Sequence, residues 1–395
     1  MNLRSRWAAL VLSFAALSAN AAVAAEPIRI GVLSDMSGVF SDFSGPGSVV
    51  AAQMAAEEFK DLGPIEILRA DHLNKSDVGA AIARRWFDVD KVDIIADTIG
   101  SAVGLAVAAV VREKGKVAIF SGAGANDLFG VACSKGGFVW AFNAYSNAHV
   151  IASALMDKGF KSWYLISQQS AWGRSTEETM LADLNSRDAR VAGVVRIPIL
   201  TEDFTSFLTT AQASRADVVA ILGGVVANQV KQATEFGVRQ GGQQLTNPMI
   251  WEHQVFGAGL ENAQGMYVAA PTYWDLDEGT REWAKAFSKR TGYAPSMTHM
   301  GTYSGVRHFL QAVRKTGSRD PSVVTEEMRR TPVEDATTHG TIRPDGLVSR
   351  DYYLFQVKSP AESKQPWDIY KVIKKISSAD AMPPLKGSAC PLVHD

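Results

Sequence analysis

The sequence predicts an α/β protein with two lobes, each built around a parallel β-sheet. Three observations support this fold class. Short β-rich apolar runs alternate with amphipathic helical stretches along most of the chain, which is typical of βαβ units. The alternation restarts after residues 138–145, so two like halves follow one another. The roughly 370 residues after residue 25 exceed what one hydrophobic core usually supports, which favours two lobes.

The first half is expected to contain four strands separated by helices. The strands are residues 28–33, 65–68, 92–96 and 117–120, and the helices are residues 49–59, 77–87 and 102–113. Asp77 can cap the second helix, because its side-chain oxygen can accept hydrogen bonds from free N–H groups of the first turn. Residues 92–96 are nearly all apolar, as expected for a strand that is covered on both faces.

The second half repeats this order and then changes. The expected strands are residues 163–166, 190–195, 218–222 and 248–251, and the expected helices are residues 174–184, 204–213 and 227–236. Further helices are expected at 280–290, 303–316 and 322–330, and two paired strands at 351–357 and 367–376. The halves are not separated by a long Gly/Ser-rich or Pro-rich linker. Several short crossings are therefore expected, which permit hinge closure but not free tumbling.

The first 25 residues have the pattern of a secretory signal peptide. Arg4 and Arg6 precede an apolar run at 7–17, and the small residues at 23–25 form a cleavage site before Glu26. The apolar run is far shorter than the ~20 residues that span a bilayer. A cysteine near the cleavage site is absent, so a lipid anchor is not expected. The sequence therefore predicts a periplasmic protein that starts at Glu26.

The overall charge and the two cysteines restrict the environment of the protein. The net charge is −1, with 46% hydrophobic and 21% charged residues, which offers no basic surface for nucleic acid or an anionic membrane. In an oxidising compartment, Cys133 and Cys390 are expected either as a disulfide that ties the C-terminal tail to the loop near residue 133 or as two unpaired buried thiols. Their spacing excludes a C-x-x-C metal site.

The sequence lacks common enzyme motifs. It contains no G-x-S-x-G, P-loop or H-E-x-x-H pattern, and no two of its seven histidines lie four residues apart. Gly45-Pro46-Gly47 follows the first strand, but the third glycine of a dinucleotide-binding loop is missing. We therefore expect no catalytic residues, no bound metal and no cofactor.

Three segments lie where parallel sheets bind ligands, at the carboxyl ends of strands. They are residues 35–43, 98–101 and 121–126, and each supplies small residues, a hydroxyl group or backbone donors at a helix start. This composition suits a carboxylate, because backbone N–H groups at helix N-termini attract anions. The alternative is that these are ordinary turns, whose Gly, Ser and Asn residues only satisfy the backbone geometry.

Four stretches carry a resemblance to a known family. They are IRIGVLSDMSG at 28–38, DHLNK at 71–75, SGAGAN at 121–126 and DFTSFL at 203–208. Together they resemble the type I periplasmic solute-binding proteins of branched-chain amino acid ABC transporters, which include the leucine/isoleucine/valine-binding proteins. The resemblance implies two doubly wound parallel-sheet lobes joined by three hinge crossings, with the ligand between them. The N-terminal lobe would comprise residues 26–145 plus 275–346, and the C-terminal lobe residues 146–274 plus 347–395.

The resemblance places the carboxylate end of the site in the first lobe. The serine that binds the ligand carboxylate in the family matches Ser101, at the start of the helix after the third strand. A backbone contact falls on Ala123, whereas the position of the family's threonine hydroxyl is Ala125 in this chain. One hydrogen bond to the ligand is therefore expected to be missing.

The walls that the resemblance implies are aromatic. The first-lobe aromatic residue that covers the ligand matches Phe43, and a second-lobe tyrosine matches Trp172, for which packing alone is the alternative. A second tyrosine is replaced by Val225, and Tyr145 is a further candidate near the first crossing. The cleft is thus expected to be wider and more apolar than an amino-acid site.

Glu252 decides between two classes of ligand. It matches the acidic residue that receives the α-ammonium group of an amino acid in the family. If it faces the cleft ionised, an amine is favoured. If it is protonated, turned aside or paired with His253, the aromatic walls suit a hydrophobic carboxylate held by Ser101. A solvated loop carboxylate without a role in binding is the alternative.

The sequence therefore predicts a non-catalytic receptor for a small organic acid, either an amino acid or an aromatic or hydrophobic carboxylate. Its lobes would close on the ligand, and the permease subunits of an inner-membrane ABC importer would receive it. We expect a monomer. A sensory protein that presents its ligand to a membrane receptor or kinase is the alternative, while a periplasmic enzyme would need a nucleophile–base pair or a metal cluster.

Overall fold

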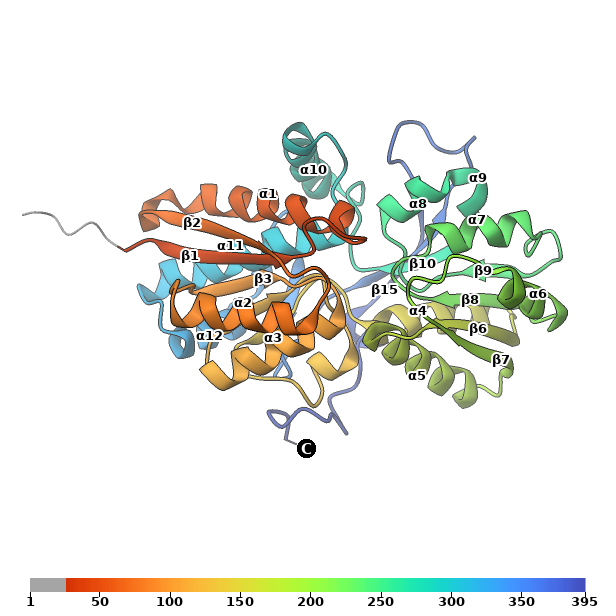
Figure 1. The fold of residues 1–395 in the computed structure, drawn as a ribbon, viewed down its shortest axis with the longest axis horizontal. Coiled ribbons are helices and arrows are strands. Elements are labelled where there is room, and N and C mark those ends of the chain that lie inside the picture. Colours follow the sequence, from red (N-terminus) through yellow and green to blue (C-terminus); the bar gives the residue numbers. More distant parts are fainter. Residues whose placement is uncertain (1–25, 395) are drawn as a thin grey trace, which may run out of the picture.

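The computed structural model describes residues 26–394 and consists of two α/β lobes that lie side by side (Figure 1). The first lobe holds a five-stranded sheet in the order β2-β1-β3-β4-β5, and the second holds a seven-stranded sheet in the order β15-β14-β10-β9-β8-β6-β7. The predicted signal peptide at residues 1–25 lies outside the described residues. Within residues 26–394, no helix combines the length and apolar character that a membrane crossing needs.

The first sheet is parallel throughout and has helices on both faces. Its strands are β1 (Ile28–Ser34), β2 (Ile65–Asp71), β3 (Ile94–Asp97), β4 (Val117–Phe120) and β5 (Gly137–Val139); the helices of the lobe are α1 (Gly45–Ala56), α2 (Ser76–Asp88), α3 (Ser101–Lys114), α10 (Glu278–Thr291), α11 (Met297–Thr316) and α12 (Pro321–Arg330). In β3, Ile94 packs into the cluster beneath α1 and α11, and Ile95 packs into the cluster beneath α2 and α3. Successive side chains of a strand point to opposite faces, which explains the nearly unbroken apolar run.

The second sheet is parallel from β7 to β10 and antiparallel at β14 and β15. Its strands are β6 (Ser162–Gln168), β7 (Arg190–Ile197), β8 (Val218–Leu222), β9 (Gln244–Thr246), β10 (Tyr267–Ala270), β14 (Tyr352–Val357) and β15 (Tyr370–Ile376); the helices are α4 (Ala144–Asp157), α5 (Ala171–Ser186), α6 (Thr205–Ala213), α7 (Ala227–Glu235), α8 (Glu252–Ala258) and α9 (Leu260–Ala263). The paired strands that the sequence predicts at 351–357 and 367–376 are confirmed by the pairing of β14 with β15.

The strand expected at 248–251 is wrong. The strand is β9, a few residues earlier, and residues 248–251 are irregular. Pro248 has no N–H group for a sheet ladder, and its carbonyl oxygen accepts from Asn147 Nδ2 at 3.2 Å. The hydroxyl group of Tyr370 donates to the carbonyl oxygen of Ile250 at 2.6 Å. Side chains from other elements thus form hydrogen bonds with the backbone of this segment, which its apolar sequence predicted to be a strand.

Two further differences between the predicted and the observed elements concern the residues at which helices begin. Asp77 lies inside the first turn of α2 rather than at its cap, which is Lys75 and makes no side-chain capping bond. The helix expected from residue 303 begins at Met297, because the side chain of Ser296 accepts from the N–H of His299 while that imidazole accepts from the N–H of Ser296. Helix α4 and strand β10 were not predicted from the sequence.

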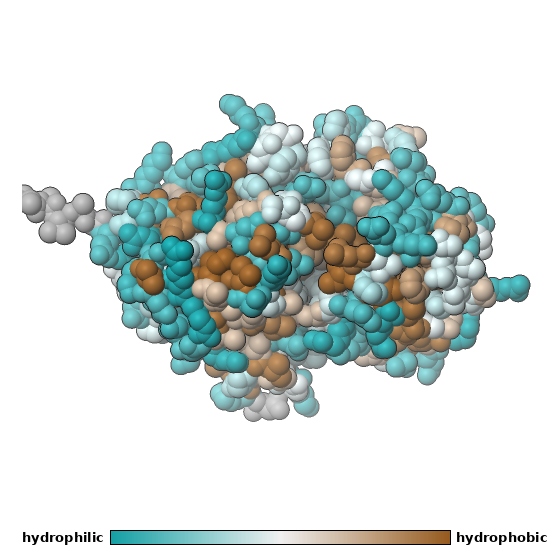
Figure 2. All heavy atoms as spheres, in the orientation of Figure 1, coloured by the Kyte–Doolittle hydropathy of each residue, from teal (hydrophilic) through white to brown (hydrophobic). Residues whose placement is uncertain are grey.

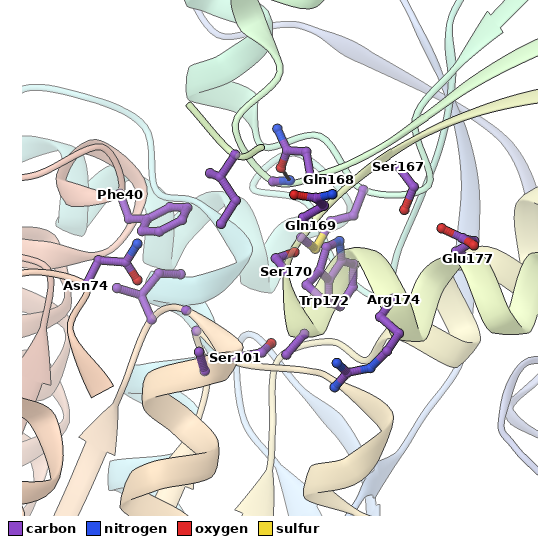
Figure 3. Close-up of a pocket in the computed structure, with 18 of the residues that line it drawn as sticks. Phe40, Asn74, Ser101, Ser167, Gln168, Gln169, Ser170, Trp172, Arg174 and Glu177 are labelled. Atoms are coloured by element: carbon purple, nitrogen blue, oxygen red, sulfur yellow. Dashed lines mark hydrogen bonds between the residues drawn. The ribbon is translucent and has the colours of Figure 1, made fainter. Parts of the chain in front are cut away.

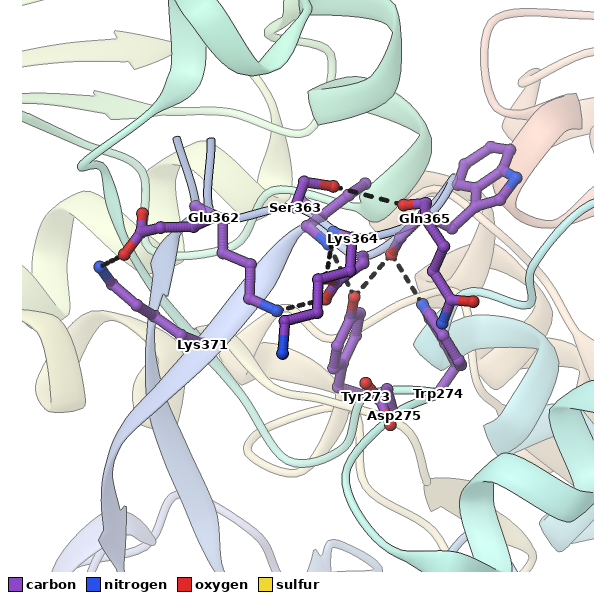
Figure 4. Close-up of polar contacts among 12 residues, drawn as sticks. Tyr273, Trp274, Asp275, Glu362, Ser363, Lys364, Gln365 and Lys371 are labelled. Atoms are coloured by element: carbon purple, nitrogen blue, oxygen red, sulfur yellow. Dashed lines mark hydrogen bonds and ion pairs between the residues drawn. The ribbon is translucent and has the colours of Figure 1, made fainter. Parts of the chain in front are cut away.

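The chain passes between the two sheets three times, after β5, after β10 and before β14. A small sheet of β11 (Val333–Glu334), β12 (His339–Ile342) and β13 (Val348–Ser349) precedes the third crossing. At the second crossing, Tyr273 Oη and Trp274 Nε1 both donate to the carbonyl oxygen of Trp367, at 2.6 and 2.9 Å (Figure 4). This crossing is therefore fastened to the segment that leads into β15. We infer lobe boundaries at the three crossings.

The C-terminal tail adds a fourth, covalent connection. Helix α13 (Ser378–Ala381) packs against α4 of the second lobe, and the chain then turns to the first lobe, where Cys390 forms a disulfide with Cys133. Arg343 Nη1 also donates to the carbonyl oxygen of Pro383 at 2.6 Å. Of the stretch 347–395, expected in the second lobe, the last residues are thus tied to the first lobe by the disulfide.

Candidate functional site

A cavity of about 930 Å³ lies between the lobes. The surface near the middle of the molecule is richer in hydrophobic residues than the outer ends, which are mostly hydrophilic (Figure 2). The cavity lining comes from both lobes and from a segment that joins them (Figure 3). From the first lobe it includes Phe40, Asn74, Ile99, Gly100, Ser101, Ala102 and Gly122, from the second Ser167 to Trp172, Arg174, Glu177, Glu178, Leu181, Arg196, Ile199, Gly224, Met249 and Trp251, and from the first crossing Phe142.

The first-lobe wall is the N-terminus of α3. Asp97, Thr98 and Gly100 all have left-handed backbone angles, which turn the chain sharply from β3 into the helix. The side-chain oxygen of Ser101 accepts from the N–H groups of Gly124 and Ala125, at 3.4 and 3.2 Å. The first N–H groups of an α-helix have no acceptor within the helix, and they carry a partial positive charge. This wall can therefore hold an anion.

The second-lobe wall is the N-terminus of α5. Ser170 caps this helix by accepting from the N–H of Gly173 at 2.9 Å. The side chain of Gln168 fixes the neighbouring loop, because its Nε2 donates to the carbonyl oxygen of Val225 at 2.8 Å and its Oε1 accepts from the N–H of Gly224 at 3.1 Å. The indole of Trp172 lies on the first turn of α5 and lines the cavity.

Aromatic rings form much of the remaining lining, but they are not all the rings that were expected there. Phe40 lines the cavity, whereas Phe43 lies behind the wall and stacks on Trp251 with ring centroids 4.2 Å apart. The ring of Phe142 meets the indoles of Trp172 and Trp251 edge to face, at 5.3 and 5.8 Å. Such pairs hold each ring in a fixed orientation. The sequence motif thus leads to the correct turn, in which Phe40 lines the cavity and Phe43 packs behind it.

The structure brings Ser101 and Trp172 together on the cavity and leaves the other expected contacts off its lining. Ala123 and Ala125 are buried, because Gly104 of α3 packs on Ala123 and the N–H of Ala125 donates to Ser101 Oγ. Val225 contributes its carbonyl oxygen to Gln168. Tyr145 does not reach the site, since its ring stacks on His149 at 5.3 Å, and burial together with Asp183 raises the pKa of its hydroxyl.

Glu252 is buried and turned away from the cavity lining. It is the first residue of α8, its side chain is inaccessible, and neither carboxylate oxygen has a hydrogen-bond partner among the described residues. Burial raises the pKa of Glu252 to about 8, so the group is a neutral acid at neutral pH. Burial also raises the pKa of Tyr370, and the charge of Glu252, when present, adds to that rise.

His253 is not an ionic partner for Glu252. Its ring nitrogens are buried and have no partner among the described residues, and burial lowers the pKa of the imidazole to about 3. The ring packs instead against Trp367 and Tyr293, with centroids 4.7 and 5.4 Å apart. Glu252, which was expected to decide between ligand classes, is thus a neutral acid outside the lining, and no charged group among residues 26–394 pairs with it.

The lining also contains charged residues that the sequence did not predict for the site: Arg174, Glu177, Glu178 and Arg196. Arg174 lies 3.5 Å from Asp127 of the first lobe, and both oxygens of Glu177 accept from Arg196 Nε, at 3.0 and 3.1 Å. Next to Asp127, the N–H of Asn126 donates to Ser175 Oγ at 3.1 Å, so the lobes touch beside the cavity. Helical spacing from Ala171 could have found Arg174 and Glu178, and from Arg174 also Glu177. Arg196 instead comes from a strand that only the fold brings near.

Two α/β lobes that enclose a cavity across short crossings define a periplasmic solute-binding protein of type I. The chain belongs to the periplasmic binding protein family, whose sequence pattern matches residues 27–364. It is similar to a periplasmic binding protein from Burkholderia mallei, with 34% identity, a TM-score of 0.89, and coverage of 93% of this chain and 99% of the other.

Two further solved structures have the same fold. A branched chain amino acid ABC transporter periplasmic ligand-binding protein from Burkholderia xenovorans LB400 is 36% identical, with a TM-score of 0.86 and coverage of 93% and 100% of the two chains. A solute binding protein of an ABC transporter from R. palustris, in complex with 4-hydroxybenzoate, is 19% identical, with a TM-score of 0.80 and coverage of 89% and 97%. No curated protein matches the chain.

The family and its solved members are substrate-binding components of ABC transporters, so this chain binds a solute rather than transforming it. Within residues 26–394, His, Cys, Asp and Glu side chains form no cluster of three or more that could hold a metal ion.

Proposed function

We propose that the protein captures a small aromatic or otherwise hydrophobic carboxylate between its lobes in the periplasm and delivers it to the permease of an ABC importer. The observation that carries this proposal is the position of Glu252. The acid that would receive an amino group is buried, neutral and off the cavity lining. An α-ammonium group enclosed in the cavity would lose its hydration without gaining this partner, at a cost of several kcal/mol.

The ligand's carboxylate would lie at the start of α3. Ser101 supplies a hydroxyl group there, and the free N–H groups of the first helical turn supply further donors. The body of the ligand would lie among the rings of Phe40, Phe142 and Trp172. An aromatic ring is favoured in such surroundings by burial of its faces and by edge-to-face contacts.

Closure of the lobes would follow from the division of these contacts between the two sides. Ser101 belongs to the first lobe and Trp172 to the second, so a ligand gains both contacts only when the lobes are closed. The equilibrium then shifts by the difference in affinity between the closed and open forms. The R. palustris neighbour, whose fold is the same, is a precedent for an aromatic acid in this architecture.

Calorimetric titration of the protein with benzoate, 4-hydroxybenzoate, leucine and phenylalanine tests the ligand class. The two aromatic acids are expected to bind and the two amino acids are not. In the Glu252→Gln variant, the affinity for the aromatic acids is expected to stay within about twofold, because the neutral amide replaces a neutral acid of the same shape. Tight binding of an amino acid that Glu252→Gln abolishes would overturn the proposal, since Glu252 would then be an ammonium receptor.

A further inference from the structure

The cavity extends beyond the facing walls of the two lobes and along α5. Its lining on α5 runs from Ala171 to Leu181, and ten residues of α-helix span about 15 Å. Arg174, Glu177 and Leu181 follow Ala171 at helical spacing, so they share one face of the helix. Figure 3 shows Arg174 and Glu177 further along α5 than Trp172, on the side of the site away from Phe40 and Ser101. Past Trp172, the cavity therefore continues along the second lobe.

We name this extension the α5 groove. Its lining residues are Arg174, Glu177, Glu178, Leu181, Arg196 and Ile199. The volume of the whole cavity, about 930 Å³, lies near the upper end of the roughly 300–1,000 Å³ typical of sites for drug-sized molecules. One ring with a carboxylate at Ser101 would leave the groove unfilled.

The charges of the α5 groove are balanced. Two arginines, Arg174 and Arg196, face two acids, Glu177 and Glu178. The side chain of Glu177 is only 6% exposed, and Arg196 neutralises it by donating to both of its oxygens. Arg174 lies within ion-pair distance of Asp127. The groove therefore has no surplus of positive charge that would select a second anionic group.

The remaining walls of the groove are suited to an uncharged tail. Leu181 and Ile199 contribute apolar side chains. The guanidinium group of Arg196 is planar, so its free face can pack against a ring or a methylene chain while its edge stays bound to Glu177. These features favour burial of an apolar chain or a second ring.

We propose that the α5 groove is a tail subsite, and that the preferred ligand is an elongated monocarboxylate. Its carboxylate lies at Ser101, its body passes Trp172, and its aryl or alkyl tail follows α5 as far as Leu181. This inference rests on the proposed function, because it assumes the same carboxylate end. It adds a specificity determinant that chooses among hydrophobic acids by length.

Calorimetry with a series of ω-phenyl carboxylates tests the subsite. Benzoate, 4-phenylbutanoate and 6-phenylhexanoate share the carboxylate and differ in reach. Affinity is expected to rise along the series by up to about fourfold for each methylene that becomes buried. In Leu181→Trp, the added indole fills the end of the groove, so the affinity for 6-phenylhexanoate is expected to fall about tenfold while that for benzoate stays unchanged.

Ala182→Trp is the matched control, because Ala182 is the next residue on α5, is exposed and does not line the cavity. It is expected to bind every acid as the unmodified protein does. Ile199→Trp approaches the groove from the opposite wall and should repeat the selective loss, which guards against misfolding of Leu181→Trp; circular dichroism checks both folds.

Equal affinity for short and long acids, or the same affinity profile in the groove variants as in the Ala182→Trp control, would overturn the tail subsite and leave the proposed function intact. Loss of benzoate and 6-phenylhexanoate binding to the same degree in the folded groove variants would also overturn it, since length would not be read there. Failure of every acid to bind the unmodified protein would instead overturn the proposed function itself.

Discussion

The two walls of the cavity are held in place by different means. Beneath the first-lobe wall, a buried polar network supports the turn before α3: Ser44 Oγ donates to Asp97 Oδ2 at 2.6 Å and lies 2.8 Å from Ser34 Oγ, while His299 Nε2 lies 2.9 Å from the carbonyl oxygen of Ser44. Burial raises the pKa of Asp97 to about 6, although the serine hydroxyl groups oppose the rise. The second-lobe wall is instead one face of α5, whose side chains reach directly into the cavity.

This difference indicates how the site divides its tasks. The first-lobe wall presents hydroxyl and backbone donors whose positions depend on many buried bonds, so it suits a group that every ligand shares, the carboxylate. The second-lobe wall presents side chains on a regular helix, and these can change without loss of the fold. Selectivity for the rest of the ligand is therefore expected to reside on α5.

Loss of the disulfide that ties the C-terminal tail to the first lobe is expected to have a larger effect than a change in either wall. The disulfide joins residues 257 positions apart and ties the tail of the second lobe to the first. Cys390→Ser is expected to lower the free energy of unfolding by about 2–5 kcal/mol, because the unfolded chain gains freedom when a long loop opens. Urea unfolding under oxidising conditions measures this loss, and the unmodified protein under reducing conditions is the control. Equal stability of the variant and the oxidised parent would contradict the structural role of the tail.

A smaller effect separates the two serines of the lining, Ser101 in the first lobe and Ser170 in the second. Ser101→Ala is expected to weaken carboxylate binding by about 1–3 kcal/mol, because one oxygen of the ligand loses its partner. Ser170→Ala removes the cap of α5 and is expected to cost about 1 kcal/mol of unfolding free energy, with little change in affinity. Calorimetry and urea unfolding of both variants, with Ser101→Thr as the variant that keeps the hydroxyl group, measure the contrast. Equal losses of affinity in the two alanine variants would remove the distinction between the walls.

Much of the fold could be predicted from the sequence because local patterns determine it. The apolar strands β3, β4 and β8 and the amphipathic helices α2 and α3 lie where their periodicity indicates, within a few residues. The segment at 248–251 was misread because its apolar residues are buried without belonging to a sheet, and Asn147 and Tyr370 satisfy its carbonyl groups from other elements. Such long-range partners leave no periodic signal in the sequence.

The site was less predictable than the fold, since its composition depends on side-chain direction. A motif places Phe43 in the correct turn, but only the stacking on Trp251 determines that Phe40 is the ring that lines the cavity. The same applies to Glu252, whose match to the family's acidic residue can be read from the sequence but whose burial cannot. Arg196 joins the lining only because β7 ends beside α5.

The pH dependence of stability tests the state of Glu252. The folded protein keeps the proton of this acid up to its raised pKa of about 8, whereas the unfolded chain releases it near the ordinary value of 4.5. Between these values the unfolded state binds fewer protons, so the free energy of unfolding falls as the pH rises, by at most about 1.4 kcal/mol per pH unit. Glu252→Gln lacks this dependence, and its stability relative to the parent is expected to increase from about pH 4.5 to about pH 8 and to level off above.

The comparison with the parent is needed because buried histidines act in the opposite direction. Burial lowers the pKa values of His72 and His299 to about 4 and that of His253 to about 3, so the unfolded state takes up their protons first and stability falls below about pH 6.5. These contributions cancel in the difference between the two proteins, measured by urea unfolding at each pH. A difference that does not change with pH would mean that folding leaves the pKa of Glu252 unshifted. The acid would then be ionised in the folded protein, and the second-lobe side of the cleft could receive an ammonium group, which would return the ligand class to amino acids.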